Sequence, residues 1–240
     1  MRVNDCIESL SGVTESGTYL NVYPGYSFTD SSQKITIIPS QKENIGIVCY
    51  VRLSSTNAVV DFRFNWGTAE GYVFNLDLTS KEIKLKMFNG TVLKRVNTVY
   101  FKEDTWYKVK MYRVGTLCHF EINGYHLCYD SLEAPIDASK IEILSGTTTD
   151  FWVSDLVLYE HQCIYGQFSI NGEVSSDAIV RLHYQNTGIL YDFCYTSENG
   201  HYSFLVETND STDPVMFVYG YAKNNNSMQP KGVSNIRLSL

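Results

Sequence analysis

Apolar and polar residues alternate with a period of two along most of the first two thirds of the chain. Strands have this period because successive side chains point to opposite faces of a sheet. Turns rich in Gly, Asn, Ser and Thr separate the alternating segments, which are 45–53, 58–66, 71–78, 82–88, 106–114 and 116–122. A helical turn is suggested only in 131–140, where Pro135 keeps it short. Closely spaced strands with short turns predict an antiparallel β-sandwich or barrel and not an alternating β/α enzyme fold.

The alternation also predicts which side chains form the core. The residues expected to point inward are Ile47, Cys49, Val51, Val60, Phe62, Phe64, Trp66, Cys118, Phe120 and Ile122. Their neighbours along each strand, such as His119 and Glu121, are expected to be exposed. Each sheet should therefore have one apolar face and one polar face with scattered rings.

Composition agrees with a sheet protein and limits the number of domains. The 240 residues include 18 Tyr and 12 Phe but 5 Pro, and they can form one large β domain or two smaller ones. The formal net charge of −7 is spread over both halves of the chain. We therefore expect no nucleic-acid partner, because neither half could bind phosphates through bulk charge.

The N-terminus lacks the apolar run of a signal peptide, and nowhere do roughly 18 apolar residues run together. We expect a soluble protein that is made in the cytoplasm and has no membrane partner. The six cysteines form no CxxC pair and have no metal-ligand spacing, so we expect them to be reduced. The one disulfide to check is Cys118–Cys128, across the hairpin in 104–127.

Two segments of the first 160 residues carry a family resemblance. WYKVKMYRVGTLCHFEING (106–124) resembles the W-Y-x-V … G … F-x-V-N-G hairpin of concanavalin A-like, laminin-G-like jelly-roll domains, and FWVSDLVLYE (151–160) is similar to their closing strand. The resemblance covers residues 1–161 and implies an antiparallel jelly-roll sandwich. Lectins, carbohydrate-binding modules, glycan hydrolases and lyases, and supporting domains share this fold, so it does not decide the activity.

The pattern changes after Cys163. A short strand is followed by A-x-V-x-L, T-G and T-x-x-N-G-x-Y-x-F, with matching residues Gly166, Ala178, Val180, Leu182, Thr187, Gly188, Thr196, Asn199, Gly200, Tyr202 and Phe204. These residues resemble a carboxypeptidase-regulatory-like, transthyretin-like β-sandwich over 162–240, a kind of module that usually serves as a spacer. The Asn199-Gly200 pair is expected to form a tight hairpin turn with positive φ, and Tyr202, Phe204 and Val206 to alternate into the core. We predict two domains, 1–161 and 162–240, with an Ig/transthyretin-like sandwich as the second.

Motifs of known chemistry are absent from the sequence. It has no GxSxG, HExxH or Gly-rich phosphate loop, and no signature joins its nearest candidate carboxylates Asp61, Asp77 and Glu121 into a glycosidase pair. We therefore expect no enzyme, no catalytic residue and no cofactor. The five histidines share no spacing, so we expect no metal site on them. A structural calcium is the alternative, but it would have too few oxygen ligands, namely Asn4, Asp5 and Asp155.

Sugar binding is the function that the outward side chains favour. Sugar sites combine an aromatic platform with planar polar groups that hydrogen-bond to hydroxyls. The outward residues that offer both, expected on one face, are Tyr50, Arg52, Asp61, Arg63, Asn65, Asn75, Asp77 and Tyr112. An ordinary solvated sheet face is the alternative. Trp66, Trp106 and Trp152 could also serve as stacking platforms, but alternation places Trp66 in the core, and Trp106 lies where the family motif buries its Trp.

The combination of the two modules resembles structural and adhesion proteins of bacteriophages, which lysis releases without an export signal. It implies a non-enzymatic component of a virion (tail, baseplate or head fibre) with a lectin-like, glycan-binding N-terminal domain. The alternative is a stand-alone carbohydrate-binding protein or an accessory module of a glycan-degrading system. Expected partners are a cell-surface glycan, other virion or assembly proteins bound through the C-terminal domain, and further copies in a homo-oligomer. The expected location is a virion or another extracellular assembly.

Overall fold

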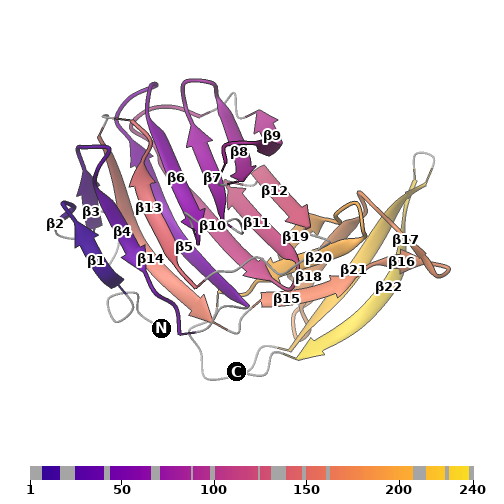
Figure 1. Ribbon diagram of the computed structural model, residues 1–240. Coiled ribbons are helices and arrows are strands. Elements are labelled where there is room, and N and C mark those ends of the chain that lie inside the picture. Colours follow the sequence, from indigo (N-terminus) through magenta and orange to yellow (C-terminus); the bar gives the residue numbers. More distant parts are fainter. Residues whose placement is uncertain are drawn as a thin grey trace.

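The computed structural model describes residues 7–16, 25–40, 44–65, 71–87, 89–97, 101–123, 125–130, 139–147, 150–160, 163–207, 215–224 and 227–237. Its regular elements are antiparallel β-strands, which confirms the predicted all-β sandwich class (Figure 1). Within these residues, no helix is long and apolar enough to cross a membrane. The suggested helical turn falls almost wholly on 131–138, outside the described residues.

Residues 7–160 form a jelly-roll sandwich of two 7-stranded sheets. Sheet I contains, in spatial order, β1 (Ile7–Ser11), β4 (Lys34–Ile37), β13 (Ile141–Ser145), β6 (Val59–Phe64), β7 (Tyr72–Asp77), β8 (Glu82–Met87) and β9 (Val92–Asn97). Sheet II contains β12 (Tyr125–Asp130), β11 (Leu117–Ile122), β10 (Trp106–Val114), β5 (Ile45–Leu53), β14 (Phe151–Glu160), β3 (Gly25–Phe28) and β2 (Thr14–Ser16). The chain crosses between the sheets several times, so strands that are close in sequence can lie on opposite sides of the sandwich.

Aromatic rings of both sheets meet in the core. Phe62 and Phe74 of sheet I pack on Phe120 of sheet II, with ring centroids 5.5 and 5.0 Å apart. All three rings are fully buried, and burying each one contributes about 1.5–3 kcal/mol. The side chains predicted to point inward are buried in every case that the structure describes, and Trp66 lies outside the described residues.

One prediction on sheet II is wrong, and the one disulfide left to check is excluded. Trp106 is opposite Arg52 on the outer face and is half-buried, while its neighbour Tyr107 takes the core position. The register of β11 and β12 places Cys118 opposite Tyr129 and Cys128 opposite His119, so the two cysteines point to opposite faces. This register rules out the Cys118–Cys128 disulfide.

The C-terminal part contains three smaller sheets. They are β15 (Cys163–Gln167) with β20 (His201–Leu205), β16 (Ser169–Ile170) with β17 (Glu173–Val174), and the 4-stranded order β19 (Leu190–Tyr195), β18 (Ile179–Tyr184), β21 (Val215–Asn224) and β22 (Ser227–Arg237). Tyr202, Phe204 and Val206 point into its core, as predicted. The Asn199-Gly200 prediction is only partly right: Gly200 alone has a positive φ (69°), and the turn leads from β19 in one sheet to β20 in another.

The C-terminal part packs on the outer face of sheet II. Figure 1 shows its orange strands β19 and β20 beside the ends of β11 and β12. A separate apolar cluster forms this junction, with Val48, Tyr112, Val114 and Tyr159 from the first part and Cys163 and Leu205 from the second. Independent folding of 1–161 and 162–240 stays a prediction; in the structure each part has its own core cluster, and this junction joins them.

Candidate functional site

The eight residues predicted to bind a ligand do not share one face. Asp61, Arg63, Asn65, Asn75 and Asp77 belong to β6, β7 and the turn after β6, on the outer side of sheet I. The other three, which lie on β5 and β10 of sheet II, are Tyr50, Arg52 and Tyr112. The prediction of a single face is therefore wrong, because alternation separates inside from outside but does not identify the sheet.

A hydrogen-bonded group of planar side chains lies on the outer face of sheet I. The Asp61 carboxylate accepts a hydrogen bond of 2.9 Å from the Arg63 guanidinium and one of 2.6 Å from Asn75 Nδ2. Asp61 and Asn75 are directly opposite each other on β6 and β7. Asn65 directly follows β6 and has a positive φ of 42°. Its backbone N–H donates a hydrogen bond of 2.7 Å to Lys140 O. The fold thus holds a carboxylate, a guanidinium and an amide in fixed orientations.

A second cluster continues this surface onto β8. Lys84 Nζ lies 2.9 Å from Asp77 Oδ2 and 3.1 Å from Glu82 Oε2, and Ser80 Oγ donates to Asp77. Burial would raise the pKa of Asp77, but the hydrogen bonds from Lys84 and Ser80 outweigh it and hold the pKa below its ordinary value. The Asp77 carboxylate is therefore ionised at neutral pH.

On the other side of β6, Glu142 of β13 forms two ion pairs. Its Oε1 atom lies 3.0 Å from both Lys34 Nζ and Lys140 Nζ. Burial raises the pKa of Glu142, and the two lysines lower it further than burial raises it. Alternation had not singled out this residue, although its place next to β6 makes it part of the same surface. We call the surface formed by Asp61, Arg63, Asn75, Asp77, Lys84 and Glu142 the polar face of sheet I.

Two carboxylates of the polar face, Asp77 and Glu142, are not suited to act as general acids. A glycosidase acid needs a raised pKa, whereas those of Asp77 and Glu142 are lowered. The third carboxylate considered from sequence, Glu121, lies on sheet II and cannot form a pair with Asp61 across one groove. Among the calcium ligands considered, Asn4 and Asp5 lie outside the described residues.

On sheet II, Tyr112 is removed from solvent by the C-terminal part. It is 2% exposed, its hydroxyl donates to Ser203 O at 3.0 Å, and its ring stacks on His119 at 4.7 Å. His119 was expected to be exposed and is also 2% exposed, because the C-terminal part covers this end of the face. Both side chains point outward from the sandwich, as the alternation predicts, but the C-terminal part packs on them and buries them.

The remaining two candidates on sheet II are Arg52, which lies in a row with Trp106 and Trp152, and Tyr50 beside it. Trp106 had been expected in the core and not in such a row. Trp106, Arg52 and Trp152 are successive cross-strand partners on β10, β5 and β14. The Arg52 Cζ atom lies 4.1 Å from the Trp152 ring centroid and 5.4 Å from that of Trp106. Arg52 thus lies over both rings in cation–π geometry. Tyr50, two residues before Arg52 on the same face of β5, is half-buried.

Ionic contacts fix the junction between the two parts. Lys110 Nζ, with a side chain 10% exposed, lies 3.0 Å from Asp192, 3.2 Å from Glu121 and 3.5 Å from Glu207. Burial lowers the pKa of Lys110, but the three carboxylates raise it above its ordinary value. Lys108 adds a 2.6 Å ion pair to Glu207.

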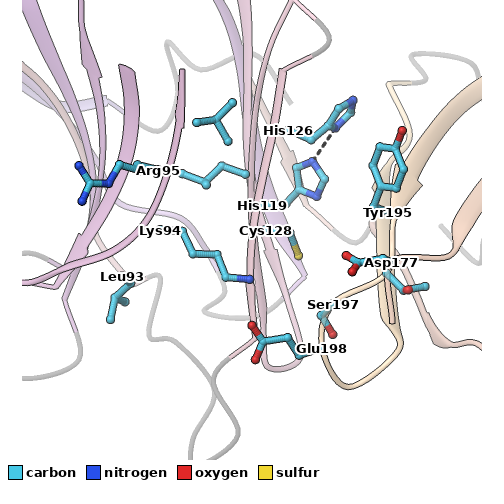
Figure 2. A pocket seen from close by; sticks show the side chains of 13 residues that line it. Leu93, Lys94, Arg95, His119, His126, Cys128, Asp177, Tyr195, Ser197 and Glu198 are labelled. Atoms are coloured by element: carbon cyan, nitrogen blue, oxygen red, sulfur yellow. Dashed lines mark hydrogen bonds between the residues drawn. The ribbon is translucent and has the colours of Figure 1, made fainter. Parts of the chain in front are cut away.

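A cavity of about 560 Å³ lies at the same junction. Figure 2 shows it between Lys94 and Arg95 of β9, the β11–β12 hairpin, and Asp177 and Tyr195 of the C-terminal part. His119 Nε2 and His126 Nδ1 are 3.1 Å apart on its wall. Burial, and to a smaller extent the two rings' proximity, holds the pKa of His119 well below its ordinary value.

No protein-family model and no curated protein sequence matches this chain. Among solved structures, it is similar to the carbohydrate-binding module CBM66 from Bacillus subtilis, with 11% identity over 63% of this chain and 98% of that one, at a TM-score of 0.44. It is also similar to chicken galectin 2, with 12% identity over 52% of this chain and 97% of that one, at a TM-score of 0.41. A Bacillus subtilis protein of unknown function with a galectin-like fold has 10% identity over 66% and 90% of the two chains, at a TM-score of 0.47. With TM-scores below 0.5, these similarities assign no function to the chain.

Proposed function

We propose that this chain is a non-enzymatic, lectin-like protein that binds glycans on the polar face of sheet I. The observation that supports the proposal is the arrangement of Asp61, Arg63 and Asn75. Their carboxylate, guanidinium and amide are fixed by mutual hydrogen bonds of 2.6 and 2.9 Å on a rigid sheet. The Asp61 and Arg63 side chains stay 14% and 19% exposed, whereas Asn75 is 2% exposed and acts by orienting Asp61. A carboxylate and a guanidinium can each contact two neighbouring sugar hydroxyls, and a preformed arrangement loses little entropy on binding.

The location of the C-terminal part supports the choice of sheet I. Its apolar and ionic contacts run to the outer face of sheet II, where they involve Tyr112, Lys108 and Lys110. The row of Trp106, Arg52 and Trp152 lies beyond this contact region on sheet II and is the alternative ligand surface. Substitutions on each face distinguish the two.

Glycan-array screening followed by calorimetry with the best ligand tests the proposal. Arg63→Lys keeps the charge but loses the planar fork, so it should weaken binding by about 1–2 kcal/mol, or roughly 5- to 30-fold. The matched control is Arg181→Lys on β18 of the C-terminal part, away from sheet I, and it should leave the affinity unchanged.

The proposal fails if the array gives no ligand, or if Arg63→Lys binds as well as the unmodified protein. Loss of binding in Trp152→Ala, with Arg63→Lys unaffected, would move the site to sheet II. Reducing-end release from polysaccharides would contradict the non-enzymatic part.

A shallow surface of this kind binds one sugar on the order of millimolar, and several linked copies can raise the apparent affinity by about 10² to 10⁴. We therefore propose a homo-oligomer or symmetric assembly held through the C-terminal part. The edge strand β19 supports this proposal, because it and the residue before it expose large apolar side chains: Ile189, Leu190, Phe193 and Tyr195. Native mass spectrometry should give oligomers of the unmodified chain and monomers of the Leu190→Lys variant. Monomers of both proteins would contradict this proposal. A place in a virion or another extracellular assembly stays a prediction.

A further inference from the structure

The hairpin of β11 and β12 brings three metal-ligating side chains together beside the cavity at the junction. Glu121 is directly opposite His126, and His119 is two residues before Glu121 on the same face of β11. One ligand atom from each of the three lies within 4.8 Å of the other two. These residues are separated in sequence by the turn at Asn123, which explains why their spacing resembles no metal-binding motif.

The separation of the two imidazoles suits a shared ion. His119 Nε2 and His126 Nδ1 are 3.1 Å apart. Two nitrogens bound to one zinc ion at about 2.0–2.1 Å and at a tetrahedral angle are about 3.3–3.4 Å apart. Figure 2 shows the two nitrogens pointing toward each other, so a shared ion requires the rings to turn toward a common point as well as to shift by a few tenths of an ångström.

The charges around the three residues also favour a cation. Glu121, Asp192 and Glu207 face two ammonium groups, those of Lys110 and Lys108, which leaves one negative charge in excess. The Glu121 carboxylate already forms an ion pair with Lys110, with Nζ 3.2 Å from Oε2, and its remaining lone pairs can bind an ion. Among the charged residues that line the cavity, Arg95 lies 3.8 Å from Glu82 outside it, which leaves Lys94 beside two carboxylates, Asp177 and Glu198.

We propose that His119, Glu121 and His126 form a binding site for one divalent transition-metal ion of the zinc class. Two imidazoles and one carboxylate are a ligand set that such ions accept, with further positions left for water or another ligand from the cavity. All three ligands come from the first part of the chain, and the C-terminal part covers them. The site is independent of the polar face of sheet I, which lies on the other side of the sandwich.

Metal titration of the tag-free protein tests this site. After treatment with a chelator, Co²⁺ is added while the visible absorption is followed, and Zn²⁺ is then used in competition. We expect one ion per chain, with absorption bands typical of a site containing nitrogen ligands. His126→Gln should weaken binding at least about 100-fold, because it removes one of three protein ligands.

His183→Gln is the matched control, since His183 lies on β18 and its Nδ1 contacts Gly188 O at 3.0 Å, away from the hairpin. It should bind the ion as the unmodified protein does. His126 is half-buried at the cavity wall, so its variant is expected to fold, which circular dichroism checks. No binding below about 100 μM, a free energy near −5.5 kcal/mol, would overturn the proposal. Equal binding by His126→Gln would also overturn it.

Discussion

The side chain of Asp130 should hold the two parts of the chain together. It is 4% exposed at the end of β12, and its Oδ1 accepts a hydrogen bond of 2.6 Å from Thr116 of the first part. Its Oδ2 accepts three bonds from the C-terminal part, from Ser197 Oγ at 3.0 Å, Asn199 Nδ2 at 3.3 Å and His201 Nδ1 at 2.6 Å. Replacing it with Ala removes all four bonds at once.

The expected loss of stability follows from these contacts. A hydrogen bond to a charged group contributes about 1.5–3 kcal/mol, but several bonds to one carboxylate are not additive. His201 is 20% exposed and can recover part of the loss through water. We therefore expect Asp130→Ala to lower the free energy of unfolding by about 3 kcal/mol, and Thr116→Val, which removes one of the four bonds, to lower it by about 1.5 kcal/mol.

Urea unfolding followed by tryptophan fluorescence and far-UV circular dichroism measures this change. A double-mutant cycle of Asp130→Ala with His201→Ala should give a coupling energy of about 1–3 kcal/mol. If the Asp130→Ala variant lies within about 0.5 kcal/mol of the unmodified protein, the carboxylate does not hold the junction and this reasoning is refuted.

Two further predictions concern charge. Lys110→Met removes an ammonium that three carboxylates share, so it should lower the free energy of unfolding measured in urea by about 3–5 kcal/mol. The control Lys102→Met, at an exposed residue, should change it little. Equal effects of the two substitutions would contradict the account. Burial raises the pKa of Asp130, Glu142 and Asp77, but hydrogen bonds and ion pairs hold each one below its ordinary value. The unfolded chain then binds protons more readily at low pH, so the contribution of these three carboxylates should be fully present above about pH 5 and fall below about pH 4. The lowered pKa values of His119 and His126 add a loss of stability that begins below about pH 6.5. Urea midpoints that stay constant from pH 7 to pH 3 would contradict this.

Local alternation predicted the core well because burial on one side of a strand imposes a period of two. Phe62 and Phe120 were identified from sequence for this reason, and both are fully buried. Trp106 was placed in the core by the family motif instead, and that placement is wrong: a shift of one residue exchanges the two faces, and Tyr107 takes the core position. Near a strand end, a motif does not fix which of two adjacent rings points inward.

Contacts between distant segments explain the other errors. Alternation does not distinguish sheet I from sheet II, so Asp61 and Tyr50 were expected together although they lie on opposite sides of the sandwich. Tyr112 and His119 point outward as expected, but the docking of the C-terminal part buries them. The pairing of Glu121 with His126 depends on the hairpin register, which joins side chains that no sequence motif connects.

Hydrogen–deuterium exchange with the best glycan ligand tests the central claim of a binding face on sheet I most directly. We predict that the ligand slows exchange in β6 (Val59–Phe64) and β7 (Tyr72–Asp77), the strands that carry Asp61, Arg63 and Asn75. Protection confined to β5, β10 and β14, with β6 and β7 unchanged, would contradict the account.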